Sequence, residues 1–125
     1  MLYTSNFAKT KFITSMEIVP ISIARRPPSW WTGLDYIKLA PSAELLQLYK
    51  FLGDIEFYTN EFNKQLDKLN SKEVYKELVA LAGQSDIALL CYESPNNFCH
   101  RHLVADWFNN NGIPIQEIKH GTTSR

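Results

Sequence analysis

The feature that most constrains the fold is a continuous apolar run, Ile87–Tyr92, in which apolar and polar side chains do not alternate. A strand buried on both faces has this pattern, which is typical of the centre of a parallel sheet. Parallel strands need long crossover connections, and these usually contain a helix. The run therefore predicts an α/β fold.

Other segments supply the neighbouring strands. A β-branched alternation predicts a strand over Ile18–Ala24, and shorter strands are expected over Leu2–Thr4 and Ile113–Ile118. Pro20 and Pro114 cannot donate a ladder hydrogen bond, so each should lie at the start of its strand or on an edge of the sheet.

Between these strands, apolar residues recur at spacings of three and four, which predicts helices. Ser42 and Ser71 are expected N-caps, and Gly53 and Gly83 are expected to end the same two helices. Further helices are expected over residues 55–69 and from about residue 98 to residue 110. Strands that alternate with helices indicate one three-layer α/β domain over residues 1–125, a small, mainly parallel sheet flanked by helices.

Composition excludes several classes of protein. Thirteen basic residues balance thirteen acidic ones, so the chain lacks the overall positive charge that would favour nucleic-acid binding, although a local patch is compatible with it. No apolar run approaches the roughly 18 residues of a membrane span, and the N-terminus does not resemble a signal peptide. We therefore expect a cytoplasmic protein with no membrane partner, whose two cysteines are reduced thiols.

Charged and reactive residues follow two of the predicted strands. Arg25-Arg26 follows one strand, and Glu93 follows the apolar one, shortly before Cys99-His100-Arg101 at the start of a helix. Ligands of open α/β sheets bind outside the carboxyl ends of the strands. If the two strands are neighbours, these groups share that edge, where the free N–H groups of the helix start favour an anion.

The helix start offers a candidate nucleophile. With Asn97 as N-cap, Cys99 falls in the first turn, where the helix dipole favours the thiolate. A helical wheel places His100 at the centre of the buried face and His102 toward solvent. Structural roles compete with these: Cys91 as a small core residue, Cys99 as a packing residue, and His100 as a tie to a backbone carbonyl.

The same residues do not predict a metal site. Cys91, Glu93, Cys99 and His100 could supply four ligand atoms, but the C-x7-C-H spacing matches no common structural zinc pattern. The sequence names no cofactor.

The apolar strand ending in C-x-E, followed by C-H-R opening a helix, resembles the signature of the DUF488 family of uncharacterised proteins. Here the motif is Cys91 and Glu93, then Cys99, His100 and Arg101. The family also tends to have an Asp-x-Arg element before a proline, and Arg25-Arg26-Pro27 lacks the acid. The resemblance implies a small cytoplasmic α/β protein and a connected set of residues, but no reaction.

We expect a small enzyme that acts on an anionic or nucleotide-like substrate at the carboxyl edge of the sheet. Arg25 and Arg101 would bind a phosphate or carboxylate, Glu93 or His100 would serve as general acid or base, and Cys99 as nucleophile.

Two other functions remain open. The chain could be a non-catalytic module that binds nucleic acid or a protein through Arg25, Arg26, Trp30 and Trp31. Alternatively, the motif could be structural, with Arg101 paired to Glu93.

Overall fold

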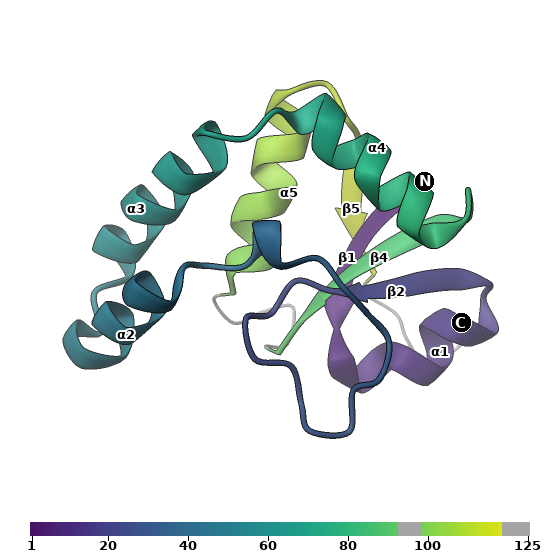
Figure 1. Cartoon of the computed structure of the whole chain (residues 1–125), viewed down its shortest axis with the longest axis horizontal. Helices are drawn as coiled ribbons and strands as arrows, with labels where there is room; N and C mark the ends of the chain where they lie inside the picture. Colours follow the sequence, from purple (N-terminus) through teal and green to yellow (C-terminus); the bar gives the residue numbers. More distant parts are fainter. Residues whose placement is uncertain (93–98, 119–125) are drawn as a thin grey trace.

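A parallel sheet forms the centre of the molecule (Figure 1). The computed structural model describes residues 1–92 and 99–118. Five parallel strands lie in the order β3-β2-β4-β1-β5. They are β1 (Leu2–Asn6), β2 (Ile18–Ser22), β3 (Leu34–Asp35), β4 (Asp86–Cys91) and β5 (Ile115–Glu117). The predicted apolar strand, β4, is the central one, so the predicted fold class is confirmed.

Helices cover both faces of this sheet. They are α1 (Thr10–Ser15), α2 (Ala43–Leu52), α3 (Ile55–Asp67), α4 (Ser71–Ala82) and α5 (His100–Asn110), with 3-10 turns η1 (Phe7–Lys9) and η2 (Ile37–Leu39). Figure 1 shows α1 on one side of the strands and α4 and α5 on the other, with α2 and α3 beyond α5. The larger core holds Phe62, Leu78 and Phe108 from α3, α4 and α5, and the smaller core holds Ile13 from α1. The three layers are therefore as predicted.

The boundaries of α2 and α4 follow from their caps. The Ser42 side chain accepts a hydrogen bond from the Leu45 amide, as predicted. α4 is capped by Asn70 rather than by Ser71, because the Asn70 side chain accepts the bond from the Glu73 amide. Gly53 and Gly83 end the two helices with φ of 67°, a left-handed conformation that glycine adopts without steric cost.

Both prolines lie where no backbone N–H is needed for a hydrogen bond to a neighbouring strand. Pro20 belongs to β2, which has neighbours on both sides, but the short β3 pairs only with Ile21 and Ser22. Of the strands in the described part of the chain, β4 alone therefore lies beside Pro20. Pro114 immediately precedes the edge strand β5. The expected edge positions are confirmed, in the first case because the neighbouring strand is short.

Several elements differ from the prediction. α1 has six residues and β3 has two, so neither is long enough to leave a clear periodic pattern. β2 ends at Ser22 rather than at residue 24, and β5 covers only Ile115–Glu117. α5 begins at His100, two residues after the expected start. The last difference changes the environment of Cys99, as described below.

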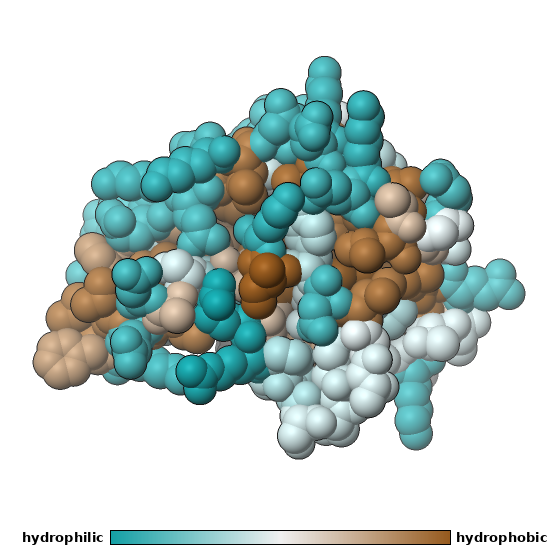
Figure 2. Space-filling model, viewed as in Figure 1, coloured by the Kyte–Doolittle hydropathy of each residue, from teal (hydrophilic) through white to brown (hydrophobic). Residues whose placement is uncertain are grey.

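Apolar side chains reach the surface at the corner between α2 and α3. Leu48, Phe51, Leu52 and Ile55 are exposed there, and Figure 2 shows brown surface at this end of the molecule. Among the described residues, no helix has both the length and the apolar content needed to cross a bilayer.

Candidate functional site

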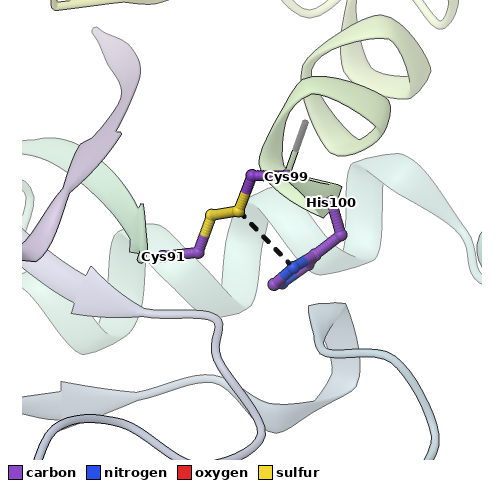
Figure 3. Close-up of side chains that lie close together, drawn as sticks. All are labelled: Cys91, Cys99 and His100. Carbon is purple, nitrogen blue, oxygen red and sulfur yellow. Dashed lines mark hydrogen bonds between the residues drawn. A yellow bond between two sulfur atoms is a disulfide. The ribbon is translucent and has the colours of Figure 1, made fainter. Parts of the chain in front are cut away.

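Three reactive side chains meet at the carboxyl edge of the sheet, where the parallel strands end. Cys91 is the last residue of β4, Cys99 is the N-cap of α5, and His100 is the first residue of that helix. One potential ligand atom from each of the three lies within 4.8 Å of the others, and all three side chains are buried. Figure 3 shows Cys99 and His100 projecting from the start of α5 towards the end of β4. We call these residues the Cys–His cluster.

Cys91 and Cys99 are joined by a disulfide bond (Figure 3). This corrects the expectation of two reduced thiols. The sequence shows only that the cysteines are eight residues apart, and it does not show that the start of α5 returns to the end of β4. The prediction of Cys91 as a core residue is compatible with its burial, with its sulfur bonded to Cys99.

The N-terminus of α5 also differs from the prediction. Cys99 is the N-cap and has extended backbone angles, so it lies before the first turn rather than inside it. The expected cap, Asn97, and the proposed acid or base, Glu93, lie outside the described residues. An extended Cys99 is compatible with its disulfide to Cys91, whereas the prediction considered only the capping preference of asparagine.

His100 points inward, as the helical wheel predicted. Its Nε2 lies 2.6 Å from the carbonyl oxygen of Ile23, just beyond the end of β2. A carbonyl only accepts, so Nε2 carries the proton and Nδ1 keeps its lone pair. Nδ1 lies 4.0 Å from Cys99 Sγ. Burial lowers the pKa of His100 to about 4, so the imidazole is neutral at ordinary pH.

Arg101 is fully buried and paired with Glu117, whereas the predicted partner Glu93 lies outside the described residues. Its Nε and Nη2 each donate to one carboxylate oxygen of Glu117, both at 3.0 Å. Its Nη1 donates to Cys91 Sγ at 3.2 Å. Thr4 of β1 donates to Glu117 Oε1 at 2.6 Å. Arg101 therefore links β5 to the disulfide, and its role as a substrate ligand stays a prediction in which an anion would compete with Glu117.

A further polar group lies beside Cys91. Asn6 ends β1 and is in register with Cys91 in the parallel ladder, so both side chains leave the sheet on the same face. Asn6 is 7% exposed, and its Oδ1 is buried with no hydrogen-bond partner among the described residues. A buried oxygen without a partner is costly, which makes this position notable.

The sequence did not single out Asn6, Thr4 or Glu117. A signal was nevertheless present. In a strand, residues two apart share a face, so Thr4 lies on the same face as the core residue Leu2, and Glu117 on the face of Ile115. Polar residues on a buried face require partners, and each of these two side chains is a partner of the other.

The other predicted group, the arginine and tryptophan loop, follows β2. Arg25 Nε donates to the Pro41 carbonyl at 2.6 Å, and Arg26 is exposed. Trp30 is 57% exposed, whereas Trp31 packs against the smaller core.

The loop joins an aromatic group at the same edge. The Phe7 ring, directly after β1, contacts Trp30, Trp31 and Tyr92 at centroid distances of 6.2, 5.3 and 5.2 Å. Tyr92 directly follows β4, and its hydroxyl donates to the Arg26 carbonyl. The carboxyl edge thus carries both the Cys–His cluster and an aromatic group beside two arginines.

A family model described as "Active DUF488-N3 subclade" matches residues 9–112. The chain belongs to the DUF488-N3a family. The matched range contains the C-x-E and C-H-R elements, so the resemblance based on these residues is confirmed. Searches of curated proteins and of solved structures gave no match. DUF488-N3a membership supplies no reaction, and the function has to be argued from the site.

Proposed function

We propose that this DUF488-N3a protein is an enzyme that acts on an anionic, nucleotide-like substrate at the carboxyl edge of its sheet. The observation that carries the proposal is the position of the Cys–His cluster. Cys91, Cys99 and His100 meet where β4 ends and α5 begins, which is where open α/β sheets bind ligands. The family description also calls this subclade active.

The proposed substrate class follows from the other groups at the carboxyl edge. The Nε of Arg25 donates to the Pro41 carbonyl, and the two terminal nitrogens of Arg25 suit a phosphate. Trp30, in the loop that begins with Arg25-Arg26, exposes more than half of its surface, and an exposed indole can stack on a nucleobase. A phosphate site next to an aromatic face fits a nucleotide better than a simple carboxylate.

The chemistry would use a thiol and a neutral imidazole. After reduction of the disulfide, Cys99 would provide a nucleophile, and His100 Nδ1, 4.0 Å away, could accept its proton. The role of Glu93 as acid or base stays a prediction, because it lies outside the described residues. Arg25 takes the main part in substrate binding, because Arg101 is already paired with Glu117.

The non-catalytic alternative uses the same loop. The exposure of Trp30 and of Arg26 favours a single-stranded nucleic acid as much as a nucleotide. The two functions differ in what they require of Cys99. An enzyme needs its thiol, whereas a binding module that uses Arg25, Arg26 and the tryptophans does not.

Binding of nucleoside monophosphates to the reduced protein tests the proposal. Isothermal titration calorimetry measures affinity, and mass spectrometry of the incubated nucleotides detects a product. We expect Arg25→Gln and Trp30→Ala each to weaken binding about tenfold, with Lys72→Gln on the exposed face of α4 as an unaffected control. Cys99→Ser should keep binding and lose turnover.

Two results would count against the enzyme. Absence of binding by every nucleotide, or equal binding by the Arg25→Gln variant, would overturn the proposed site. Tight, strongly salt-dependent binding of single-stranded nucleic acid, without any product and unchanged in Cys99→Ser, would establish the binding module instead.

A further inference from the structure

We propose that Cys91, Cys99 and His100 together bind a divalent transition-metal ion of the zinc class when the two cysteines are reduced. The inference goes beyond the proposed function, because it concerns a metal site. A bound ion occupies Cys99 Sγ and His100 Nδ1, so the nucleophile and proton-acceptor roles proposed above belong to the reduced, metal-free protein. The linear spacing of these residues argued against a metal. The fold supplies what the spacing lacks, by bringing the end of β4 and the start of α5 together.

The positions of the three side chains suit one ion. Ligand atoms bound tetrahedrally to zinc lie about 3.5–3.8 Å apart, given the usual Zn–S and Zn–N distances. The candidate atoms lie within 4.8 Å of one another, and the two sulfurs, bonded to each other in this structure, would have to move apart on reduction to hold an ion. The Cα atoms of Cys91 and Cys99 are 7.1 Å apart. Two reduced sulfurs at this backbone separation have room to separate and hold an ion between them.

His100 is arranged as metal-binding histidines usually are. Such a histidine donates its second ring N–H to a carboxylate or backbone carbonyl, which fixes the tautomer and turns the other nitrogen to the metal. His100 Nε2 donates to the Ile23 carbonyl at 2.6 Å, and Nδ1 faces Cys99 Sγ. The ring of Phe62 packs edge-on against the imidazole, with centroids 5.5 Å apart, and restricts its rotation.

The surrounding charges also fit. Two thiolates and one divalent cation have no net charge, and Arg101 with Glu117 form a second neutral pair. The hydrogen bond from Arg101 Nη1 to Cys91 Sγ is of the kind that supports a metal-bound thiolate. A buried site with balanced charge avoids most of the desolvation cost of an isolated ion.

Asn6 supplies an independent observation. Its buried Oδ1 lacks a partner among the described residues and leaves the sheet on the same face as Cys91. It could bind the metal or accept a hydrogen bond from a metal-bound water. Three protein ligands with a fourth position for water or substrate are typical of catalytic zinc sites, whereas structural sites have four protein ligands.

The proposed loading requires two balanced steps. A thiol reductant gives two electrons and two protons to the Cys91–Cys99 disulfide, which becomes two thiols while the reductant becomes its own disulfide. The metal ion then displaces one proton from each thiol and forms two metal–sulfur bonds, while His100 Nδ1 donates its lone pair. A small-molecule disulfide that accepts two electrons from the two thiolates would re-form the Cys91–Cys99 bond and release the ion, and would itself leave as two thiols after taking up two protons.

Cobalt(II) is a suitable probe, because zinc has no visible spectrum. The full chain is reduced with a phosphine, freed of metal with a chelator and titrated with Co²⁺ under anaerobic conditions. We expect one equivalent to produce thiolate-to-cobalt charge-transfer absorption and the intense visible bands of a tetrahedral site, both removed by Zn²⁺. The oxidised protein should produce neither.

Substitutions assign the ligands. Cys91→Ser, Cys99→Ser and His100→Gln should each weaken cobalt binding by more than the roughly 10–100-fold typical for loss of an outer-shell partner. His102→Gln is the matched control on the same helix and should bind normally. Circular dichroism shows whether each variant folds. If a variant does not fold, the wild-type protein assigns the two cysteines instead. Bound Zn²⁺ should protect both of them from alkylation.

The proposal fails if the reduced, folded protein shows no charge-transfer band even when Co²⁺ is raised to about a millimolar excess. It also fails if the band persists in the folded Cys91→Ser and Cys99→Ser variants. Alkylation of both cysteines at equal rates with and without Zn²⁺ would overturn it by a second route.

Discussion

Arg101 and Glu117 form a two-point ion pair beneath the carboxyl edge, with Nε–Oε1 and Nη2–Oε2 distances of 3.0 Å. The Arg101 side chain is fully buried and that of Glu117 is 11% exposed. The pair joins α5 to β5, and through Nη1 it reaches Cys91. An arginine this deep in a small domain needs its partner, because an unpaired buried charge is strongly destabilising.

Removal of one member of this pair should therefore destabilise the fold. We expect Glu117→Gln to lower the free energy of unfolding by about 3–5 kcal/mol, measured by urea denaturation. The exposed pair Lys64–Glu61 is the control, and Glu61→Gln should cost less than about 1 kcal/mol. Equal effects of the two substitutions would show that the Arg101–Glu117 pair is not buried in solution.

Phe62 joins the core of α3 to the Cys–His cluster. It is fully buried and packs against the His100 ring, so Phe62→Ala should cost about 3–5 kcal/mol of unfolding free energy. Phe51 on α2 is 86% exposed, and Phe51→Ala should change stability by less than about 0.5 kcal/mol. Thermal denaturation of both variants gives the comparison, and a similar loss in each would contradict this assignment of the core.

Glu77 should make stability depend on pH in the acid range. Hydrogen bonds from Tyr36, first, and from Lys38 lower the pKa of Glu77 below its ordinary value of 4.5. A lowered pKa in the folded state means that the stabilisation is present above pH 4.5 and is lost as pH falls through the folded pKa.

Glu77→Gln should therefore be less stable than the wild type at neutral pH, and the difference should narrow on acidification. Tyr36→Phe removes the main cause of the lowered Glu77 pKa. The loss of stability caused by Glu77→Gln should therefore be smaller in a protein that also carries Tyr36→Phe. Melting temperatures at several pH values measure it. A difference that is constant from pH 7 to pH 3 would contradict the assignment.

The cysteines should differ in their response to reduction. Without a reductant, neither Cys91 nor Cys99 should react with iodoacetamide, because they are joined to each other. After reduction we expect Cys99 to react first, since it lies at the helix N-terminus beside His100, while Cys91 is 1% exposed at the strand end. Peptide mass spectrometry follows both sites over time, and alkylation of the untreated native protein would contradict the disulfide.

The sequence could predict those helices and strands whose residue patterns depend on burial alone. The uninterrupted run Ile87–Tyr92 predicted the central strand, and the spacing of apolar residues over 55–69 predicted α3, because burial alone determines both patterns. Short elements such as β3 were not predicted, because two residues are too few to form a periodic pattern.

The sequence identified several residues of the site but not the contacts between them. Cys99 and His100 were singled out, whereas the pairing of Arg101 with Glu117 depends on β1 lying between β4 and β5. Strand order is not encoded in local periodicity, so a partner on β5 could not be identified from the C-H-R motif alone. The same limit explains why the disulfide was not expected, since it depends on how α5 returns to β4.

The central claim is that Cys91, Cys99 and His100 act together as one chemical centre at the carboxyl edge of the sheet. The most direct test is a crystal structure of the phosphine-reduced protein grown with Zn²⁺, with anomalous data collected on both sides of the zinc absorption edge. We predict an anomalous peak within bonding distance of the two Sγ atoms and His100 Nδ1, with His100 Nε2 still on the Ile23 carbonyl. Reduced cysteines with no anomalous peak between them, or with the His100 ring turned away, would contradict the account.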